Sequence, residues 1–422
     1  MKILMLSWEY PPALVGGLGR HVHALATSLA TAGHAVTVVT RQAPGAPADE
    51  VADGVRVVRA TPDPVGLPMD PANLLPWALA FNHALTRAAL GAGGGHDVVH
   101  AHDWLVAHAA MTVHEAAGTP LVATIHATEA GRHQGHLPHP HNRTIDGVER
   151  WLSASAARVI VCSDYMRAEV SRQFDVPADG IDVVANGVEA LRWQARPRAV
   201  AAARARFAPA GAPLVSFAGR LVYEKGVQHA VAAVPRLRLR HPGLRLVVAG
   251  DGPHRAALQA QAAELGVADA VDFTGFLGGH DLPALMAASD CYVVPSIYEP
   301  FGMVALEAAA AGTPVAVAAT GGLAEIVEPG GTGVQFPPGD PDGLADAVSS
   351  LLLDTDYARA LARRARRRVR DEFNWPAIAA RTAAVYAAAA GPAPQARPAE
   401  SPAQPPAEPA GRPGRLQEAG RA

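Results

Sequence analysis

The sequence contains little cysteine, little charge and no long uninterrupted hydrophobic run. Its two cysteines, Cys162 and Cys291, cannot form a disulfide framework or a cysteine-rich metal site. Charged residues make up 18% of the chain and the net charge is −3, so nothing electrostatic favours nucleic-acid binding. Without about 18 uncharged apolar residues in a row, no transmembrane helix is predicted. The N-terminal apolar run of about five residues is too short for a signal peptide, which predicts a cytoplasmic protein with reduced thiols.

Hydrophobic residues are plentiful and regularly spaced. They make up 49% of 422 residues, which excludes global disorder and suits two or three domains. Apolar runs typical of buried strands alternate with amphipathic runs typical of helices. The predicted strands cover 2–7, 36–40, 55–60, 98–100, 121–125, 159–162, 214–218, 244–249, 271–273, 291–295, 314–318 and 333–336. Strands joined by helices form parallel sheets, which predicts an α/β fold of two doubly wound, Rossmann-like units facing a central cleft.

Changes in composition divide the chain into five segments. A first unit covers 1–193, a linker rich in Ala, Arg and Pro covers 194–212, and a second unit covers 213–374. A final helix is predicted over 375–390. Residues 391–422 are rich in proline and lack apolar periodicity, which predicts a disordered tail.

A glycine-rich loop follows the first predicted strand. Gly16, Gly17 and Gly19 lie between that strand and a helix predicted over 21–32. Glycines let backbone N–H groups approach a phosphate and the helix dipole favours the anion, although a tight turn has the same composition. The spacing is not the GxGxxG dinucleotide pattern. The second strand is followed by Arg41 rather than an acidic residue, which disfavours NAD and leaves NADP open.

Histidines and an aspartate follow two strands of the first unit. His100, His102 and Asp103 end one strand, and His126 follows the next. Because ligands bind beyond the carboxyl ends of parallel strands, these residues are expected at the ligand-binding edge. Any one histidine is more often a core or surface residue, and the chain has 18. The His-x-His-Asp spacing suggests metal ligation, but one strand end cannot direct all three side chains to one ion without strain, so no metal is expected.

Two Asp-x-Asp sequences, at 340–342 and 354–356, also have a metal-binding composition. Both precede predicted helices, over 341–353 and 357–369, where aspartate is an ordinary N-cap. Neither follows an apolar strand at the binding edge. Both are therefore predicted to cap helices rather than to bind a metal.

Two cations follow the strand predicted over 214–218. Arg220 comes just after the strand end, and Lys225 follows after a short loop. Arginine offers a bidentate fork and lysine a point charge, a combination that suits a diphosphate. Gly250 follows the next strand in a similar turn.

Two glutamates lie near the strand that ends at 295. Glu299 is in the following loop, and Gly302 precedes a helix over 303–311 that contains Glu307. The neighbours of Glu307 are mostly apolar, so its carboxylate needs a partner. Such a carboxylate can accept hydrogen bonds from two ribose hydroxyls.

These motifs together resemble the retaining GT-B glycosyltransferases of family 4. Glu299 and Glu307 form the Glu-x7-Glu pattern, and Arg220 and Lys225 form the Gly-Arg…Lys-Gly pair. The first half adds Ser-Trp-Glu-Tyr-Pro-Pro, Gly-Gly-Leu-Gly and His-Ala-His-Asp-Trp, which are similar to motifs of bacterial and archaeal glycogen synthases. The similarity is greatest to actinobacterial α-1,4-glucosyltransferases that make glycogen or methylglucose lipopolysaccharide. It covers about residues 1–390.

The resemblance implies roles for these residues. Asp103 and His126 are expected to face the transferred glucose, and Glu299 to bind its hydroxyls. Arg220 and Lys225 are expected to neutralise the leaving diphosphate. The implied donor-binding set also includes Gly16, Gly17, Gly250, Gly302 and Glu307, with Gly17 at the donor phosphate and sugar and Glu307 at the ribose. The terminal helix is expected to recross to the first unit, anchored by Trp375 and Tyr386.

The predicted reaction is the transfer of glucose, with retention, from ADP- or UDP-glucose to an α-1,4-glucan. The first unit is expected on the acceptor side and the second to bind the nucleotide sugar, with no metal cofactor. Glycogen synthases that use ADP-glucose often have lysine where this chain has Val15, so the donor base stays open, and no nucleophile is identified. One alternative is a family 4 mannosyltransferase or other hexosyltransferase acting on a lipid or small molecule. Others are an NADP-dependent oxidoreductase and a non-enzymatic nucleotide-binding module.

Overall fold

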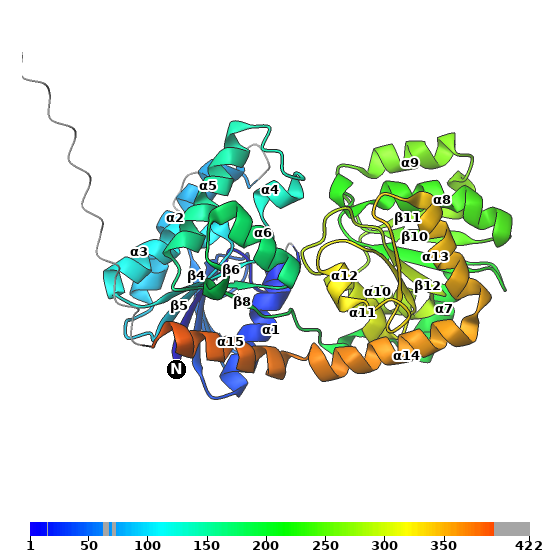
Figure 1. Ribbon diagram of the computed structural model, residues 1–422. Coiled ribbons are helices and arrows are strands. Elements are labelled where there is room, and N and C mark those ends of the chain that lie inside the picture. The colour runs from blue at the N-terminus through cyan, green and yellow to red at the C-terminus, as the bar shows by residue number, and fades with distance from the viewer. Residues whose placement is uncertain (15, 62–66, 70–72, 392–422) are drawn as a thin grey trace, which may run out of the picture. The chain divides into compact units, whose positions relative to one another are not determined.

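The computed structural model describes residues 1–14, 16–61, 67–69 and 73–391. These residues form two β-sheets with helices packed on them (Figure 1). The predicted α/β fold with two doubly wound sheets is confirmed. Val15 and 392–422, on which the predictions about the donor base and the tail depend, lie outside the described residues.

The first sheet has eight strands in the order β3-β4-β2-β1-β5-β6-β7-β8. All neighbours are parallel except β3, which runs antiparallel to β4. The strands are β1 (Lys2–Leu6), β2 (Ala35–Arg41), β3 (Asp49–Ala52), β4 (Val55–Ala60), β5 (Val98–His102), β6 (Leu121–Ile125), β7 (Arg158–Val161) and β8 (Ile181–Val183).

Two strands of this sheet, β3 and β8, are absent from the prediction. β3 is a short edge strand with partly exposed, polar residues, so it lacks the apolar run by which a buried strand is recognised. β8 has only three residues. The antiparallel β3 also corrects the expectation of purely parallel pairing.

The second sheet has six parallel strands in the order β11-β10-β9-β12-β13-β14. All six are close to the predicted strands. They are β9 (Leu214–Ala218), β10 (Arg245–Ala249), β11 (Val271–Gly275), β12 (Cys291–Val294), β13 (Val315–Ala318) and β14 (Val334–Phe336).

Helices connect the strands in both sheets. They are α1 (Gly17–Thr31), α2 (Leu74–Gly91), α3 (Ala107–Ala117), α4 (Glu129–Arg132), α5 (Pro140–Ser155), α6 (Asp164–Phe174), α7 (Pro197–Phe207), α8 (Val227–Arg240), α9 (Arg255–Glu264), α10 (Asp281–Ala288), α11 (Met303–Ala311), α12 (Leu323–Ile326), α13 (Pro341–Leu353), α14 (Thr355–Glu372) and α15 (Trp375–Ala389). Among the described residues, no helix has both the length and the apolar character needed to cross a bilayer.

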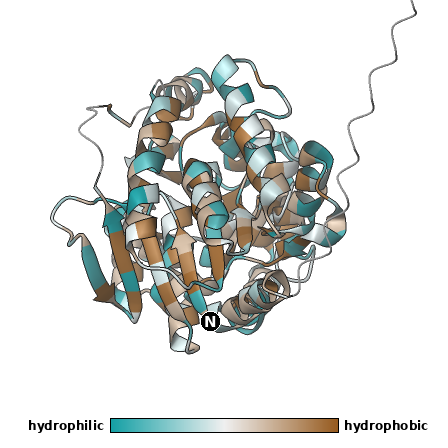
Figure 2. Ribbon diagram, turned by 90° about the vertical axis from the view of Figure 1, so that its left-hand side faces the viewer, coloured by the Kyte–Doolittle hydropathy of each residue, from teal (hydrophilic) through white to brown (hydrophobic). Residues whose placement is uncertain are grey.

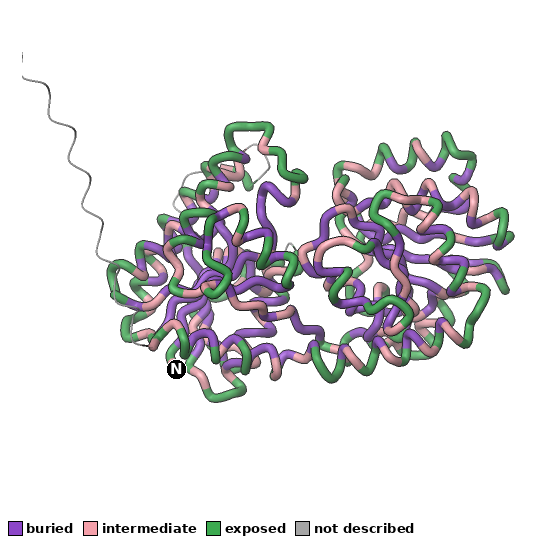
Figure 3. Tube along the Cα trace, in the orientation of Figure 1, coloured by how far each residue is buried: buried purple, intermediate pink, exposed green. Residues whose placement is uncertain are grey.

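The strands are buried on both faces, which explains their nearly continuous apolar sequences. In β1, Ile3 and Met5 belong to the core shared with α1 and α15, whereas Leu4 and Leu6 belong to the core shared with α2 and α3. Successive side chains of a strand point to opposite faces, so one apolar run supplies both cores. Figure 2 shows the strands as predominantly hydrophobic, and Figure 3 shows them as buried beneath helices with exposed outer sides.

The terminal helix α15 packs against the first sheet. Trp375, Ile378 and Tyr386 join the core of α1 and β1. The Tyr386 hydroxyl lies 2.7 Å from Nδ1 of His100 in β5. The last described helix therefore packs on the unit in which the chain begins.

The order of the strands brings particular loops together. In the first sheet the chain builds outward from β1 in one direction and from β5 in the other, and in the second sheet it does the same from β9 and β12. At such a switch point the two loops diverge and leave room for a ligand beyond the carboxyl ends of the strands. The loops after β1, β5, β9 and β12 contain most of the residues that are predicted to bind the substrates or to take part in catalysis.

Candidate active site

Asp103 and His126 lie together at the carboxyl ends of β5 and β6. The backbone N–H of His126 donates to Oδ1 of Asp103 over 2.8 Å. Burial raises the pKa of the Asp103 carboxyl to about 6, against the opposing effects of Arg132 and of this hydrogen bond. Asp103 has φ +61° and ψ 174°, a backbone conformation rarely adopted by non-glycine residues and concentrated at functional sites. The turn after β5 is thus shaped to hold this carboxylate against the His126 loop.

His126, which is partly exposed, also lies against two buried histidines. Its Nε2 lies 3.2 Å from Nδ1 of His102, and the rings of His21 and His126 are 4.7 Å apart. Burial lowers the pKa of His126 to about 4, so its imidazole is neutral at physiological pH. This neutral ring can donate or accept a hydrogen bond but provides no fixed positive charge.

His100 does not lie at the ligand-binding edge, contrary to the prediction. It is fully buried, with Nδ1 2.7 Å from the hydroxyl of Tyr386 and Nε2 2.7 Å from the hydroxyl of Thr124. His102 is two residues further along β5, so its side chain points to the same face of the sheet as that of His100, and it is also buried. His100 is a structural residue that ties β5 to β6 and α15.

The glycine loop leads into the N-terminus of α1. The N–H of Gly16 donates to Oε2 of the buried Glu9 over 3.0 Å. A Cβ on Gly17 would meet no other atom within 4 Å, whereas one on Gly19 would lie 2.6 Å from the Leu14 side chain. Gly19 thus lies against the exposed end of the Leu14 side chain, and Gly17 leaves open space at a helix N-terminus that has no capping side chain.

Lys225 and Glu299 form an ion pair between the loops after β9 and β12. Nζ of Lys225 lies 2.7 Å from Oε2 of Glu299, which also accepts from the Ser296 hydroxyl over 3.2 Å. Gly226 allows this approach, since a Cβ there would lie 1.8 Å from the carbonyl oxygen of Pro295. The ammonium and the carboxylate are thus held at one place at the switch point of the second sheet.

Arg220 is exposed, and its side chain makes no hydrogen bond or ion pair within the part of the chain that the structure describes. Gly250 lies beside the same turn, because a Cβ on Gly250 would be 1.9 Å from the carbonyl oxygen of Gly219. Gly302 has φ +104° and forms the N-cap of α11, which carries no acidic residue in its first turn. The second sheet thus presents a free guanidinium and an uncapped helix N-terminus.

The partner that the sequence requires for Glu307 is Arg20, on the first turn of α1. Nη1 of Arg20 lies 3.1 Å from Oε1 of the buried Glu307. Burial raises the pKa of Glu307 to about 7, although Arg20 acts to lower it. This pair connects the helix after the glycine loop to α11 of the second sheet.

Further contacts join the loop after β12 to the first sheet. The Tyr298 hydroxyl donates to Oε1 of Glu169 over 2.9 Å, and the Thr128 hydroxyl donates to the same atom over 2.6 Å. The Ser163 hydroxyl donates to the carbonyl oxygen of Pro300 over 2.7 Å. Tyr298 precedes Glu299 and Thr128 is two residues after His126, so the two predicted groups of site residues are connected through these bonds.

Three residues with contacts at the site were not predicted from their local sequence: Arg20, Ser296 and Glu169. Arg20 follows the glycine loop directly and could have been considered as a cation at a helix N-terminus. Ser296 lies within the quoted motif around Glu299. Glu169 lies in the middle of α6 and carries no local signal, because its role depends on the arrival of Tyr298 from the second sheet.

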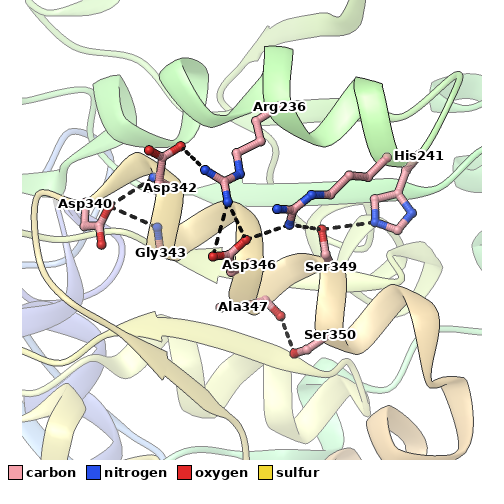
Figure 4. A network of polar contacts seen from close by, with 10 residues as sticks. Arg236, His241, Asp340, Asp342, Gly343, Asp346, Ala347, Ser349 and Ser350 are labelled. Carbon is pink, nitrogen blue, oxygen red and sulfur yellow. Dashed lines mark hydrogen bonds and ion pairs between the residues drawn. The ribbon is translucent and has the colours of Figure 1, made fainter.

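The Asp-x-Asp sequences cap helices, as predicted. Oδ1 of Asp340 accepts from the N–H groups of Asp342 and Gly343, each over 3.0 Å, at the start of α13 (Figure 4). Asp342 instead pairs with Arg236 over 2.8 Å. Asp354 accepts from the N–H of Tyr357 over 2.9 Å at the start of α14. In both sequences the carboxylate of the first aspartate satisfies helix N–H groups.

Two family models match the chain, one on each half. "Glycosyltransferase Family 4" matches residues 15–192, and "Glycosyl transferases group 1" matches residues 202–368.

Similar proteins include glycosyltransferases along nearly the whole chain. A glycogen synthase of Mycobacterium tuberculosis is 46% identical over 402 residues, which cover 92% of this chain and 95% of that protein. A D-inositol 3-phosphate glycosyltransferase of Saccharomonospora viridis is 34% identical over 85% of this chain and 86% of that protein. The solved structure of sucrose-phosphate synthase from Thermosynechococcus elongatus has a TM-score of 0.80 and 28% identity, covering 92% of this chain and 98% of that one.

Proposed function

The chain belongs to the family 4 glycosyltransferases and is a glucosyltransferase related to glycogen synthase, and from this premise we propose its donor, acceptor and stereochemistry. The proposed reaction transfers glucose from ADP- or UDP-glucose to the non-reducing end of an α-1,4-glucan with retention of configuration. The relative named glycogen synthase, with 46% identity, supports the glucan acceptor.

The observation that carries this proposal is the contact between Lys225 and Glu299. It holds a cation and a hydrogen-bond acceptor 2.7 Å apart where the chain order leaves room for a ligand. A nucleotide sugar presents the matching chemistry, since a negatively charged diphosphate is bonded directly to a ring of hydroxyl groups. Lys225 would bind the phosphates and Glu299 would accept from the sugar hydroxyls.

Other groups at the second sheet suit the diphosphate as it leaves. Negative charge accumulates on the phosphates when the bond to the sugar breaks, so positioned donors stabilise the transition state more than the ground state. Arg220 has no partner among the described side chains and is free to bind there. The N-termini of α1 and α11 offer backbone N–H groups and their dipoles.

On the first sheet, Asp103 and His126 are proposed to hold the glucose. The imidazole of His126 is neutral, so it can bind a sugar hydroxyl without adding a positive charge that would also attract the phosphates. Asp103 fixes the backbone of the His126 loop through its hydrogen bond. Glu307, which forms an ion pair with Arg20, is proposed to accept hydrogen bonds from the ribose hydroxyls.

In the proposed reaction, the bond from the anomeric carbon to the phosphate oxygen breaks and a bond to the acceptor hydroxyl oxygen forms. The acceptor proton passes to the leaving phosphate, which departs as the nucleoside diphosphate. Retention requires attack from the face that the phosphate leaves, or a covalent intermediate, and no nucleophile of this chain is assigned. The charge that a metal would supply is attributed to Arg220, Lys225 and the helix N-termini, so we propose a metal-independent reaction.

A second candidate is hexosyl transfer to a small molecule, favoured by the inositol phosphate glycosyltransferase that is 34% identical. The two candidates share the donor half of the site and differ in the acceptor. We also propose a cytoplasmic enzyme, in agreement with two cysteines that are free and buried.

The deciding experiment combines radiolabelled ADP-, UDP- and GDP-glucose, and GDP-mannose, with glycogen, maltodextrins or inositol phosphate. We expect labelled glucose to be incorporated into α-glucan and released by an α-1,4-specific amylase. Transfer to inositol phosphate alone would replace the first candidate by the second. Binding of NADP in place of all the nucleotide sugars would contradict both.

A further inference from the structure

Three histidines lie close together between the glycine loop and the loop that contains Asp103. His21 lies on α1, His102 ends β5, and His126 follows β6. One ring nitrogen from each lies within 4.8 Å of the others, and this is the only such group of potential metal ligands in the described ranges. The rings of His21 and His102 are 5.6 Å apart, and those of His102 and His126 are 5.5 Å apart.

Two nitrogens in this cluster lack a hydrogen-bond partner although they are buried. They are Nδ1 of His21 and Nε2 of His102. The exposed fraction is 7% for residue His21 and 0% for residue His102. A buried polar atom without a partner is uncommon and calls for a ligand such as water or an ion. His100, the neighbour of His102, shows the contrast, because both of its nitrogens are satisfied by hydroxyl groups.

The surroundings of the cluster suit a bound cation. Asn186 is a buried polar side chain close enough to His21 to raise the pKa of its ring, against the larger effect of burial. A polar neighbour of this kind can orient an imidazole, as outer-shell partners do at metal sites. Burial also lowers the pKa of all three rings, so they are unprotonated at neutral pH.

We propose that His21, His102 and His126 bind a divalent transition-metal ion of the Zn²⁺ type and that the bound ion inhibits sugar transfer. Three imidazoles suit Zn²⁺, whose tetrahedral sites use nitrogen ligands at about 2.0–2.1 Å and can leave the fourth position to water. The side chains would close in by small rotations on three separate elements. The set differs from the His100, His102 and Asp103 group suggested by the sequence spacing, because only His102 is common to both.

The inhibitory part rests on the proposed function, in which a nitrogen of His126 binds the transferred sugar. A metal at that nitrogen removes it from the substrate. The reaction itself needs no metal under this scheme, so the ion acts as an inhibitor and chelation restores activity.

The test begins with the metal-free full-length chain and uses Co²⁺ as a spectroscopic probe, together with calorimetric titration of Zn²⁺. The loop at 133–141 carries exposed histidines that can bind metal independently. All measurements therefore use a background with His133→Ala, His136→Ala, His139→Ala and His141→Ala. We expect one ion per chain in this background, with the visible absorption of tetrahedral Co²⁺.

His21→Ala and His102→Ala should each abolish this absorption, and Asn186→Ala should weaken Zn²⁺ affinity by about 10–100-fold. His280→Ala, at an exposed position on another element, is the matched control and should change nothing. The melting temperature of each metal-free variant verifies folding. Zn²⁺ should raise the melting temperature of the background protein and not that of a folded His21→Ala variant.

Absence of a bound ion in the background, or unchanged binding in folded His21→Ala and His102→Ala variants, would overturn the metal site and assign the free nitrogens to water. Binding at these histidines without loss of glucosyl transfer would leave the metal site in place and overturn the inhibitory role, without contradicting the proposed glucosyl transfer. Loss of transfer that follows Zn²⁺ occupancy and is reversed by EDTA supports both parts.

Discussion

Replacing Glu307 by glutamine should change how the stability of this protein depends on pH. Glu307 is buried in α11 and its usual pKa of 4.5 is raised to about 7, chiefly by burial and against the effect of Arg20. Glutamine has nearly the same volume and keeps a carbonyl oxygen for Arg20, but it does not titrate. The substitution therefore removes the ionisation and little else.

The magnitude follows from the difference between the folded and unfolded pKa values. The difference of about 2.5 between 4.5 and about 7 corresponds to about 3 kcal/mol, at about 1.4 kcal/mol for each pKa unit. The folded chain holds this proton more tightly than the unfolded chain. The contribution to stability is therefore complete below about pH 4.5 and is lost as the pH rises through about 7.

The assay is thermal unfolding of the parent and of Glu307→Gln from pH 5 to pH 8. With an unfolding entropy of about 2.1 cal/mol/K per residue over the compact unit Met1–Ala390, about 2–3 kcal/mol moves the melting temperature by about 3 °C. The parent should lose about this much relative to the variant across the pH range. Other titrating groups are common to both proteins and cancel in the comparison.

Glu264→Gln is the matched control, because Glu264 is exposed at the end of α9. Its profile should run parallel to that of the parent. If the Glu307→Gln profile also runs parallel to the parent, Glu307 does not change its protonation between pH 5 and pH 8 in the folded chain, and the reasoning from burial is wrong.

Three further outcomes are expected. Lys225→Ala should lower turnover by about 10²–10³-fold because it removes a cation from the transition state, with Lys2→Ala as the silent control; activity within twofold of the parent would refute the assignment. Activity should survive exhaustive EDTA treatment, and Asp340→Asn should leave transfer rates unchanged, whereas loss with EDTA that Mn²⁺ restores would show a required metal. Tyr386→Phe should lower the unfolding free energy by about 1–3 kcal/mol because Nδ1 of His100 loses its partner, while Tyr357→Phe should change it by less than about 0.5 kcal/mol, because the hydroxyl of this half-buried tyrosine of α14 makes no hydrogen bond with the described residues.

The sequence alone determined the fold class and the positions of most site residues along the chain. Buried parallel strands need apolar residues on both faces, and the helices between them need an apolar stripe, so the alternation can be read without a structure. Helix caps can be read in the same way, as Asp340 and Asp354 show, because the side chain bonds N–H groups only two or three residues away. The strands β3 and β8 could not be predicted in this way, because β3 is polar and β8 has only three residues.

The tertiary structure decided which side chains meet. Arg20 reaches Glu307 across 287 positions, and His100 reaches Tyr386 across 286. No local pattern encodes such pairs, because they depend on the order of strands in each sheet and on how the two sheets contact each other. The same holds for His21, which the sequence places in an ordinary amphipathic helix and the fold places beside His102 and His126. Periodicity and capping are short-range effects, whereas the partner of a buried charge or imidazole is fixed only when distant strand ends come together.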